Sequence, residues 1–264
     1  MHKVDVCWLV ILSNHLHLLL VDNHGLLGDF LRDLHRSLTR CINALRGRDT
    51  GSVWDPAAKP SVQRILDADA AISQAAYVCA NPVRAGAVAR ASEWPGLHVD
   101  PEDIGTTRTI RRPDWLASHG FHDYPDSVEL TYVEPELVTK VYGEGHFAEA
   151  VATEVARIEE EVAAKSATPP LGPEKCCETS WTRTAPDPPS KRRPGQCHPE
   201  LICSDEDYLY VAISQLQEFR QRYDHALRRY RGGRRRTRFP AGTFAMRLRH
   251  GVVVAGLSPP VAAG

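Results

Sequence analysis

The chain lacks the long hydrophobic runs that mark membrane proteins and secretion signals. Its longest apolar run, residues 6–12, is too short to span a bilayer. The chain begins Met-His-Lys-Val-Asp, which is not the basic start with an apolar signal core behind it that a secretory signal peptide has. Its seven cysteines are an odd number, which does not favour a disulfide framework. We therefore expect a soluble, cytoplasmic protein without a membrane partner.

Net charge is also nearly absent, at -1 by formal count, but the charges are segregated. Arginines crowd residues 220–249, whereas glutamates crowd residues 129–161. A nucleic-acid partner is therefore compatible with overall neutrality. With 264 residues and 42% hydrophobic content, the chain is long enough to bury a core as one domain with extensions or as two small domains.

Two histidines, His15 and His17, lie near the start of the chain with one leucine between them. Residues 4–12 are apolar on both faces of a strand, which predicts a central strand, and residues 16–21 predict the second strand of a hairpin. Because side chains alternate faces along a strand, both imidazoles point the same way. The pair forms half of a metal site, or else an exposed or hydrogen-bonded pair.

A helix is predicted after this hairpin, because apolar side chains recur with helical period over residues 27–45. Gly47 is placed to end it. The opposite face carries Arg32, Arg36 and Arg40 at four-residue spacing. Such a stripe contacts DNA phosphates or is a solvated face.

A second helix is predicted from about residue 67. It contains Tyr77, and the sequence Asn-Pro-Val-Arg-Ala-Gly follows at residues 81–86. Pro82 is expected to stop the helix. A tyrosine in an alanine-rich helix is either part of the core or a nucleophile.

The order of these motifs resembles the single-tyrosine HUH transposases, in particular the REP-associated tyrosine transposase group. The resemblance covers residues 4–97 and rests on Asn-His-Leu-His-Leu-Leu-Leu, the arginine-rich helix and Tyr-Val-x-x-Asn-Pro-Val-Arg-Ala-Gly. The sequence Gly-Ser-Val-Trp at residues 51–54 also resembles the Gly-x-x-Trp element of that group.

The resemblance implies an α+β fold, with a ferredoxin-like antiparallel sheet and helices on one side. It implies that His15 and His17 bind Mg²⁺ or Mn²⁺ and that Tyr77 attacks a DNA phosphate to give a 5'-phosphotyrosine. The expected function is cleavage and rejoining of single-stranded DNA, at repeats that form hairpins. The alternative is a catalytically inactive DNA-binding remnant of such a transposase.

Asn81 and Arg84 each have two interpretations. Asn81 lies four residues after Tyr77, where the wider superfamily places a third metal ligand of Gln or His type. The following proline biases Asn81 out of helical geometry, so a helix cap is the other interpretation. Arg84 contacts a DNA phosphate or is solvated.

The N-terminus departs from the family, which has a strand and a helix before the histidine hairpin. Only Met1, His2 and Lys3 stand there in this chain. The interpretations are a start further upstream, a strand supplied by a second chain in a homodimer, or a decayed remnant. The resulting organisation is a transposase-like domain lacking its first strand and helix (1–97), an appended segment with an acidic helix (98–165), a proline-rich linker (166–203) and a basic C-terminal helix and tail (204–264).

The C-terminal region predicts a helix over residues 205–230, then a basic run and a strand-like end at residues 252–254. Its arginines alternate with aromatic residues, as on surfaces that bind single-stranded nucleic acid, or the region is a basic helix and tail without a partner. Those aromatic residues are Tyr223, Tyr230, Phe239 and Phe244.

A zinc site is not expected from the remaining cysteines, because they lack paired Cys-x-x-Cys knuckles. The residues concerned are Cys176, Cys177, Cys197, His198 and Cys203.

Overall fold

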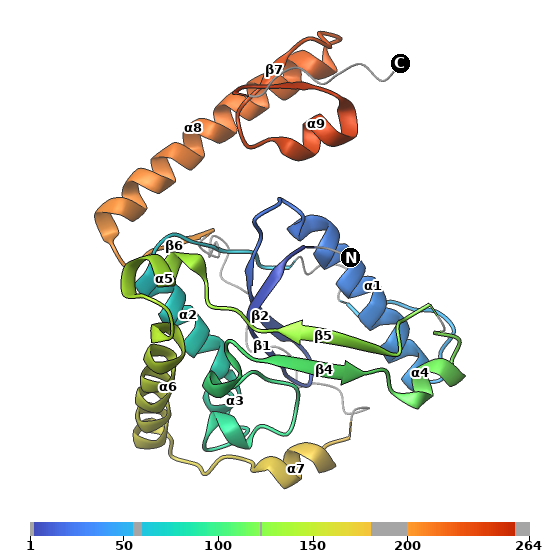
Figure 1. Cartoon of the computed structure of the whole chain (residues 1–264), viewed down its shortest axis with the longest axis vertical. Coiled ribbons are helices and arrows are strands. Elements are labelled where there is room, and N and C mark those ends of the chain that lie inside the picture. Colours follow the sequence, from blue (N-terminus) through green and yellow to red (C-terminus); the bar gives the residue numbers. More distant parts are fainter. Residues whose placement is uncertain (1–2, 55–59, 122, 181–199, 257–264) are drawn as a thin grey trace. The chain divides into compact units, whose positions relative to one another are not determined.

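The computed structural model describes residues 3–54, 60–121, 123–180 and 200–256. Helices and small two-stranded sheets, two of them antiparallel and two parallel among the described residues, make up an α+β fold, as the sequence predicts (Figure 1). The chain divides into two compact units, Met1–Ile202 (unit 1) and Cys203–Gly264 (unit 2). Within the described ranges, no helix combines the length and the apolar composition that a bilayer span needs.

The predicted N-terminal hairpin is confirmed. Strand β1 (Asp5–Ile11) pairs antiparallel with β2 (Leu16–Val21), and Val10 stands opposite His17 in the ladder. The backbone N–H of Leu12 donates to the carbonyl oxygen of His15 at 2.9 Å and closes the turn. The hairpin therefore delivers both histidines to one end of β2.

The second edge of β1 is also paired. The N–H of Ile11 donates to the carbonyl of Leu97 at 2.8 Å, and the N–H of Val99 donates to the carbonyl of Leu9 at 3.0 Å. Near the start of β1, the N–H of Val133 donates to the carbonyl of Val6 at 3.0 Å. Strand β1 is therefore central, as its two apolar faces predict, and segments far along the same chain bond to the edge opposite β2.

The two predicted helices of the first region are confirmed as α1 (Leu27–Leu45) and α2 (Ala68–Cys79). Helix α2 ends before Pro82, as expected, but Pro82 does not end helical structure altogether. Helix α2 ends at Cys79, and the short helix α3 (Asn81–Arg84) follows with Pro82 in its first turn. Proline is tolerated there because the first turn of a helix has no intrahelical acceptor for its N–H groups.

The rest of unit 1 carries short elements and one long helix, α6, which confirms the predicted acidic helix. Strands β4 and β5 pair antiparallel, and β3 and β6 pair parallel. The elements are β3 (Arg64–Ile65), η1 (Ala91–Glu93), η2 (Pro101–Asp103), β4 (Thr107–Arg111), α4 (Asp114–Ser118), β5 (Ser127–Thr131), α5 (Glu136–Tyr142), α6 (His146–Lys165), α7 (Pro173–Glu178) and β6 (Leu201–Ile202).

Part of the segment predicted to be a linker is folded. Helix α7 lies within it, and Cys176 packs against the core of unit 1. Hydrogen bonds from Leu171 and Gly172 to the carbonyls of Gly86 and Ala87 attach the preceding residues at 2.9 and 2.8 Å. Residues 181–199 lie outside the described part of the chain.

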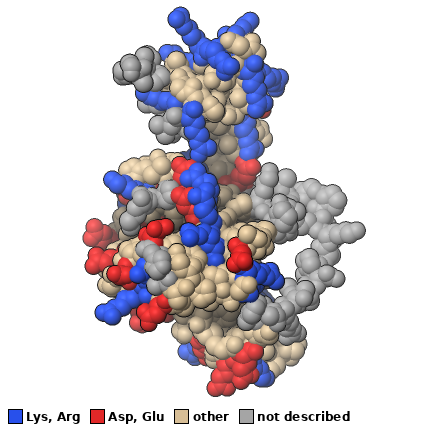
Figure 2. Space-filling model, turned by 90° about the vertical axis from the view of Figure 1, so that its right-hand side faces the viewer, with Lys and Arg blue, Asp and Glu red and all other residues tan. Residues whose placement is uncertain are grey.

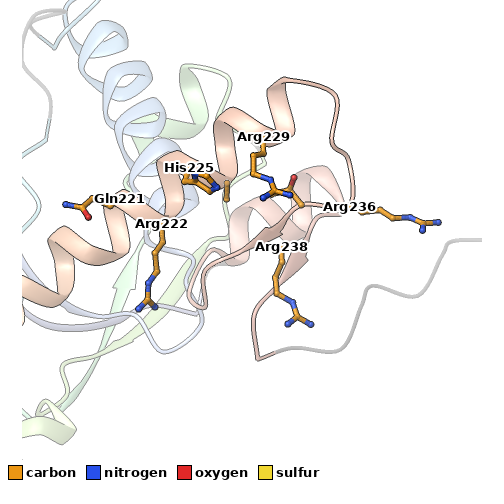
Figure 3. Close-up of a pocket in the computed structure, with 8 residues that line it drawn as sticks. Gln221, Arg222, His225, Arg229, Arg236 and Arg238 are labelled. Carbon is orange, nitrogen blue, oxygen red and sulfur yellow. The ribbon is translucent and has the colours of Figure 1, made fainter.

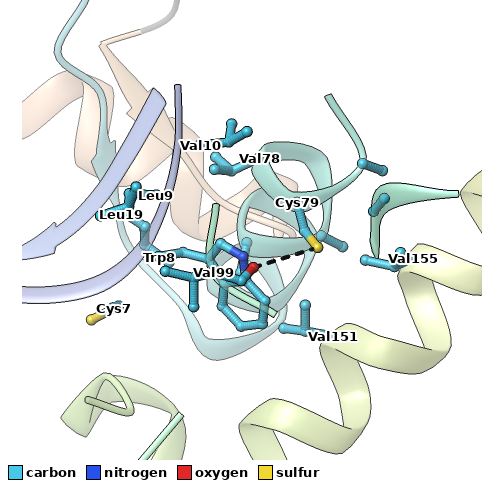
Figure 4. Close-up of a cluster of buried hydrophobic side chains, with 14 of the residues drawn as sticks. Cys7, Trp8, Leu9, Val10, Leu19, Val78, Cys79, Val99, Val151 and Val155 are labelled. Atoms are coloured by element: carbon cyan, nitrogen blue, oxygen red, sulfur yellow. Dashed lines mark hydrogen bonds between the residues drawn. The ribbon is translucent and has the colours of Figure 1, made fainter. Parts of the chain in front are cut away.

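The core of unit 1 centres on Trp8 of β1, which is completely buried. Its ring meets Phe147 of α6 edge to face, with centroids 5.7 Å apart. Figure 4 shows Trp8 among side chains from the sheet, α2 and α6, and a hydrogen bond from Cys79 to the carbonyl of Val99. Burial raises the pKa of the Cys79 thiol to about 12, so this cysteine is a packing residue.

Unit 2 is built around α8 (Glu206–Arg231), which confirms the predicted C-terminal helix. The segment after it forms β7 (Arg238–Phe239), α9 (Phe244–His250) and β8 (Val253–Val254), and β7 pairs parallel with β8. Phe239 is 1% exposed, and the rings of Tyr223 and Tyr230 pack against it. Phe239 therefore belongs to the core of unit 2, and Tyr223 and Tyr230 are partly buried against that core.

Candidate active site

Three of the residues singled out from the sequence meet at one place on unit 1. The ring of His17 lies edge to face with that of Tyr77, at a centroid separation of 5.8 Å, and His15 lies 5.0 Å from His17 in the same way. The histidines come from the hairpin and the tyrosine from α2, well apart in the sequence. The fold therefore brings a pair of imidazoles next to a phenol.

Helix α2 approaches the hairpin closely because its buried face consists of small residues. Ala75 and Ala76 are completely buried, and α2 packs against both β1 and β2. Tyr77, the next residue, is 37% exposed and stands at the margin of that face. Its phenol is therefore accessible to a ligand while its ring stays in contact with His17.

The histidines differ in how the hairpin holds them. His17 belongs to β2 opposite Val10, which is fully buried, whereas His15 precedes the strand and is exposed. The sequence predicts that His15 and His17 both lie in a strand and point to the same face. The structure keeps the two imidazoles on the same side but places His15 in the turn.

Asn14 holds the ring of His15, a role that the sequence analysis missed. The Nδ1 atom of His15 lies 2.6 Å from the amide oxygen of Asn14. Because that oxygen is an acceptor, Nδ1 carries the proton and Nε2 keeps its lone pair. A hydrogen bond of this kind orients a metal-binding histidine. The asparagine immediately before the first histidine is the sequence signal that could have revealed it.

His17 favours its neutral form. Burial, and secondarily the nearby His15, lower the pKa of His17 below its usual value of 6.5. Both causes disfavour a second positive charge at this place. A neutral imidazole with a free lone pair is the form that binds a metal ion.

Asn81 lies one helical turn beyond Tyr77, as the first residue of α3. It is 8% exposed, and its side chain has no hydrogen-bond partner among the described residues. The structure places Asn81 in a helix in spite of the following proline, because the packing that buries residues 81–83 outweighs the local bias. Its amide oxygen is therefore not committed to a helix cap in the described structure.

Arg84 joins this group from the end of α3. Its guanidinium carbon lies 5.0 Å from the centre of the Tyr77 ring. A cation over an aromatic face at this distance is attractive, and the charge lies beside the phenol. The arginine is exposed, so it can also reach an anion bound next to Tyr77.

The three arginines of α1 all have partners within the chain. Arg32 pairs with Asp29 at 2.7 Å and with Asp33 at 3.1 Å, and Arg36 lies 4.0 Å from Asp33. Arg40 stacks over the ring of Phe121 at 4.7 Å. All three are exposed, so these contacts are weak ones that a phosphate can replace.

The sequence Gly-Ser-Val-Trp holds a loop against α1. The indole N–H of Trp54 donates to the hydroxyl of Thr39 at 2.9 Å, and its ring lies 4.5 Å from that of His35. The side-chain amide of Asn43 donates to the carbonyl of Gly51 at 2.8 Å. This element therefore anchors a loop and takes no part in the histidine and tyrosine group.

Metal-ligand sets larger than the histidine pair are absent from the described residues, in which no three His, Cys, Asp or Glu side chains gather to hold an ion. Cys197 and His198, two of the residues considered for a zinc site, lie outside the described residues. The contacts of the described residues therefore bring together the two imidazoles of His15 and His17, and an ion held there would need further ligands.

Comparison with known proteins leaves this site without a template. No family model, curated protein or solved structure matches the chain significantly.

Proposed function

We propose that this chain is a DNA strand transferase of the REP-associated tyrosine transposase type, with Tyr77 as its nucleophile. The observation that carries the proposal is the meeting of His15, His17 and Tyr77 from two separate segments. Each motif alone has an ordinary structural explanation. Their contact in space, beside an exposed arginine, is what a metal-assisted attack on a phosphate requires.

The proposed fold of the catalytic part is ferredoxin-like. In favour of it are the hairpin of β1 and β2, the pairing of β1 on both edges and the packing of α2 across the two strands. The isolated bridge of Tyr132 to Val6 links the segment after β5 to β1. Such an arrangement presents the tyrosine of α2 beside the end of β2.

His15 and His17 are proposed to hold Mg²⁺ or Mn²⁺, with Asn81 as a third ligand. The fit rests on the neutral form of His17 and on the fixed tautomer of His15. When bound, the ion would polarise a nonbridging oxygen of the scissile phosphate. The two imidazoles supply no negative charge, so the phosphate and water would complete the oxygen-rich environment that these ions prefer.

Tyr77 would carry the covalent step. Its phenolic oxygen loses a proton and bonds to the phosphorus while the bond from phosphorus to the 3'-oxygen breaks. The departing oxygen takes up a proton and becomes a free 3'-hydroxyl, and the 5'-phosphate remains on Tyr77. Attack by another 3'-hydroxyl reverses these changes and joins strands, with no nucleotide cofactor.

Arg84 would bind the same phosphate, because its guanidinium already lies beside the Tyr77 ring and is exposed. Arg32, Arg36 and Arg40 are proposed to contact the DNA backbone further away, in exchange for their surface partners. The proposed substrate is single-stranded or hairpin DNA, since a phosphate next to unpaired bases can enter a site on the protein surface.

Adduct formation tests this proposal. Single-stranded oligonucleotides from the flanks of the gene are incubated with the protein and Mn²⁺, and the products are separated on a denaturing gel. We expect a protein–DNA adduct that needs the metal ion and disappears in Tyr77→Phe. The matched control is Tyr210→Phe, because Tyr210 is 74% exposed and lies in unit 2. This variant is expected to form the adduct like the wild type.

Other results would contradict the proposal. An adduct that persists in Tyr77→Phe would assign the nucleophile elsewhere. Binding of the oligonucleotides with no adduct at any metal concentration would instead support the inactive DNA-binding remnant. Circular dichroism of each variant establishes that the fold is retained.

A further inference from the structure

Unit 2 contains a hollow lined by arginines, separate from the histidine and tyrosine group. Its volume is about 590 Å³. Figure 3 shows Arg222, His225 and Arg229 projecting from α8, Arg236 from the segment before β7 and Arg238 from β7 itself. Two segments of unit 2 therefore contribute positive charge to one depression.

The net charge of unit 2 differs strongly from that of the whole chain, which is -1. Residues 203–264 contain eleven arginines and no lysine, against five acidic residues, which is a net charge of +6. Basic side chains lie around unit 2 in the space-filling view (Figure 2). Arginine presents a planar fork of N–H donors that matches a phosphate, which lysine does not.

Most of the lining arginines are uncompensated within the described residues. Arg222 pairs with Glu218 on α8, but Arg229, Arg236 and Arg238 form no ion pair there. Like charges held together without counterions repel, so the arrangement costs stability unless an anion is bound. Three guanidinium groups are therefore available to a ligand.

The segment that carries Arg236 and Arg238 is fixed to the core of unit 2. Phe239 is buried against α8 and its carbonyl accepts from the N–H of Ala255 at 2.8 Å. Thr237, between the two arginines, is 7% exposed and donates its hydroxyl to the carbonyl of Arg234 at 2.6 Å. The arginines are thus presented by an ordered backbone, which lowers the entropy cost of binding.

We propose that this hollow binds the phosphodiester backbone of DNA and gives unit 2 a DNA contact of its own. An extended chain of phosphates fits better than a single phosphate, because the arginines line a wide, open depression from two segments. Contact through phosphates makes the binding independent of base sequence and sensitive to salt. The choice of DNA as the nucleic acid rests on the function proposed above.

The aromatic residues of unit 2 set a limit on this contact. The rings of Tyr223 and Tyr230 both pack on that of Phe239, and Arg235 stacks over Tyr230 at 4.7 Å. Phe239 is buried, and Tyr223 and Tyr230 are partly buried, so much of the surface of these rings is used within the unit. We therefore expect unit 2 to bind the phosphodiester backbone of single-stranded and duplex DNA alike.

Fluorescence anisotropy of the full chain tests this assignment, with labelled single-stranded and duplex DNA of arbitrary sequence. EDTA is present, so that adduct formation does not contribute. The test variant is Arg229→Gln/Arg236→Gln/Arg238→Gln. The control, with the same change in net charge, is Arg48→Gln/Arg64→Gln/Arg111→Gln, whose residues are exposed in unit 1.

We expect the test variant to bind both DNA forms at least about tenfold more weakly at low salt, and the slope of log K against log salt to fall by about 2 for the single strand. The control is expected to change affinity far less. A second variant, with lysine at the three test positions, is expected to keep most of the salt slope, since it preserves the charge.

Equal losses in the test and control variants would overturn the assignment, as would no loss in the test variant. Competition by inorganic pyrophosphate as strong as that by DNA would show a compact phosphate site instead. Equal binding of a labelled polyglutamate peptide would show a general anion surface. Adduct formation through Tyr77 is measured separately, so failure here leaves the proposed strand transfer standing.

Discussion

The amide oxygen of Asn14 accepts a hydrogen bond from Nδ1 of His15 at 2.6 Å, and this contact decides which imidazole nitrogen of His15 can face a metal ion. Residues that hydrogen-bond to a metal ligand without touching the metal typically weaken metal binding by about 10–100-fold when they are removed. The same reasoning applies to Asn14.

Replacement of Asn14 by alanine is therefore expected to weaken Mn²⁺ binding by about 10–100-fold. The ring of His15 would lose its fixed tautomer and rotate among several orientations. Titration of Mn²⁺ followed by electron paramagnetic resonance measures the change. Ser13→Ala, in the same turn, is the control, and an equal loss in that variant would assign the effect to the turn rather than to the hydrogen bond.

His17 is expected to titrate below 6.5, because burial and the neighbouring His15 lower its pKa. In His15→Ala the midpoint of His17 is expected to rise, since one of the two causes is removed. The imidazole proton signals in an NMR titration report both midpoints. A midpoint for His17 at or above 6.5 in the wild type would contradict the prediction.

The lowered pKa of His17 also predicts how the stability of the folded chain changes with pH. The unfolded chain binds a proton at His17 more readily than the folded one, so this histidine favours unfolding as the pH falls through 6.5 and below. His17→Gln is expected to lose that part of the pH dependence. Urea denaturation at neutral and mildly acidic pH, compared between the two proteins, measures it.

Asp22 is expected to stabilise the start of α1. Burial by itself raises the pKa of its carboxyl group, but backbone donors including the N–H groups of Leu26 and Leu27, each at 2.9 Å, outweigh it and lower the pKa below 3.8. Asp22→Ala is expected to cost about 1 kcal/mol of unfolding free energy at neutral pH.

That contribution of Asp22 is present above the pKa of the unfolded chain and is lost as the pH falls through the lower folded value. Urea denaturation of wild type and Asp22→Ala at neutral pH and at acid pH measures the difference, which should shrink in acid. Asp49→Ala, an exposed aspartate, is the control. A difference that stays constant across the pH range would argue against this account.

Periodicity was sufficient to predict the local elements of this chain. The hairpin of β1 and β2 and the helices α1, α6 and α8 follow from apolar spacing together with turn and capping residues. The histidines could be recognised as a pair for the same reason, since alternation along a strand is a local property.

Contacts between distant segments could not be predicted in this way. The bonds from Leu97 and Val99 to β1, and the packing of Tyr223 on Phe239, join segments whose sequences carry no mark of one another. The start of α3 at Asn81 is a further case, because burial against the core outweighs the bias that proline imposes on the residue before it.

The two completely buried alanines of α2 act as a spacer between this helix and the strands against which it packs. A methyl group is the smallest side chain with a Cβ, so Ala75 and Ala76 set how near the helix axis lies to the strands. Any larger residue there would lift the helix and move Tyr77 away from His17. The separation of Tyr77 from His17 therefore depends on buried residues of the interior. A comparison limited to active-site residues would not include these positions.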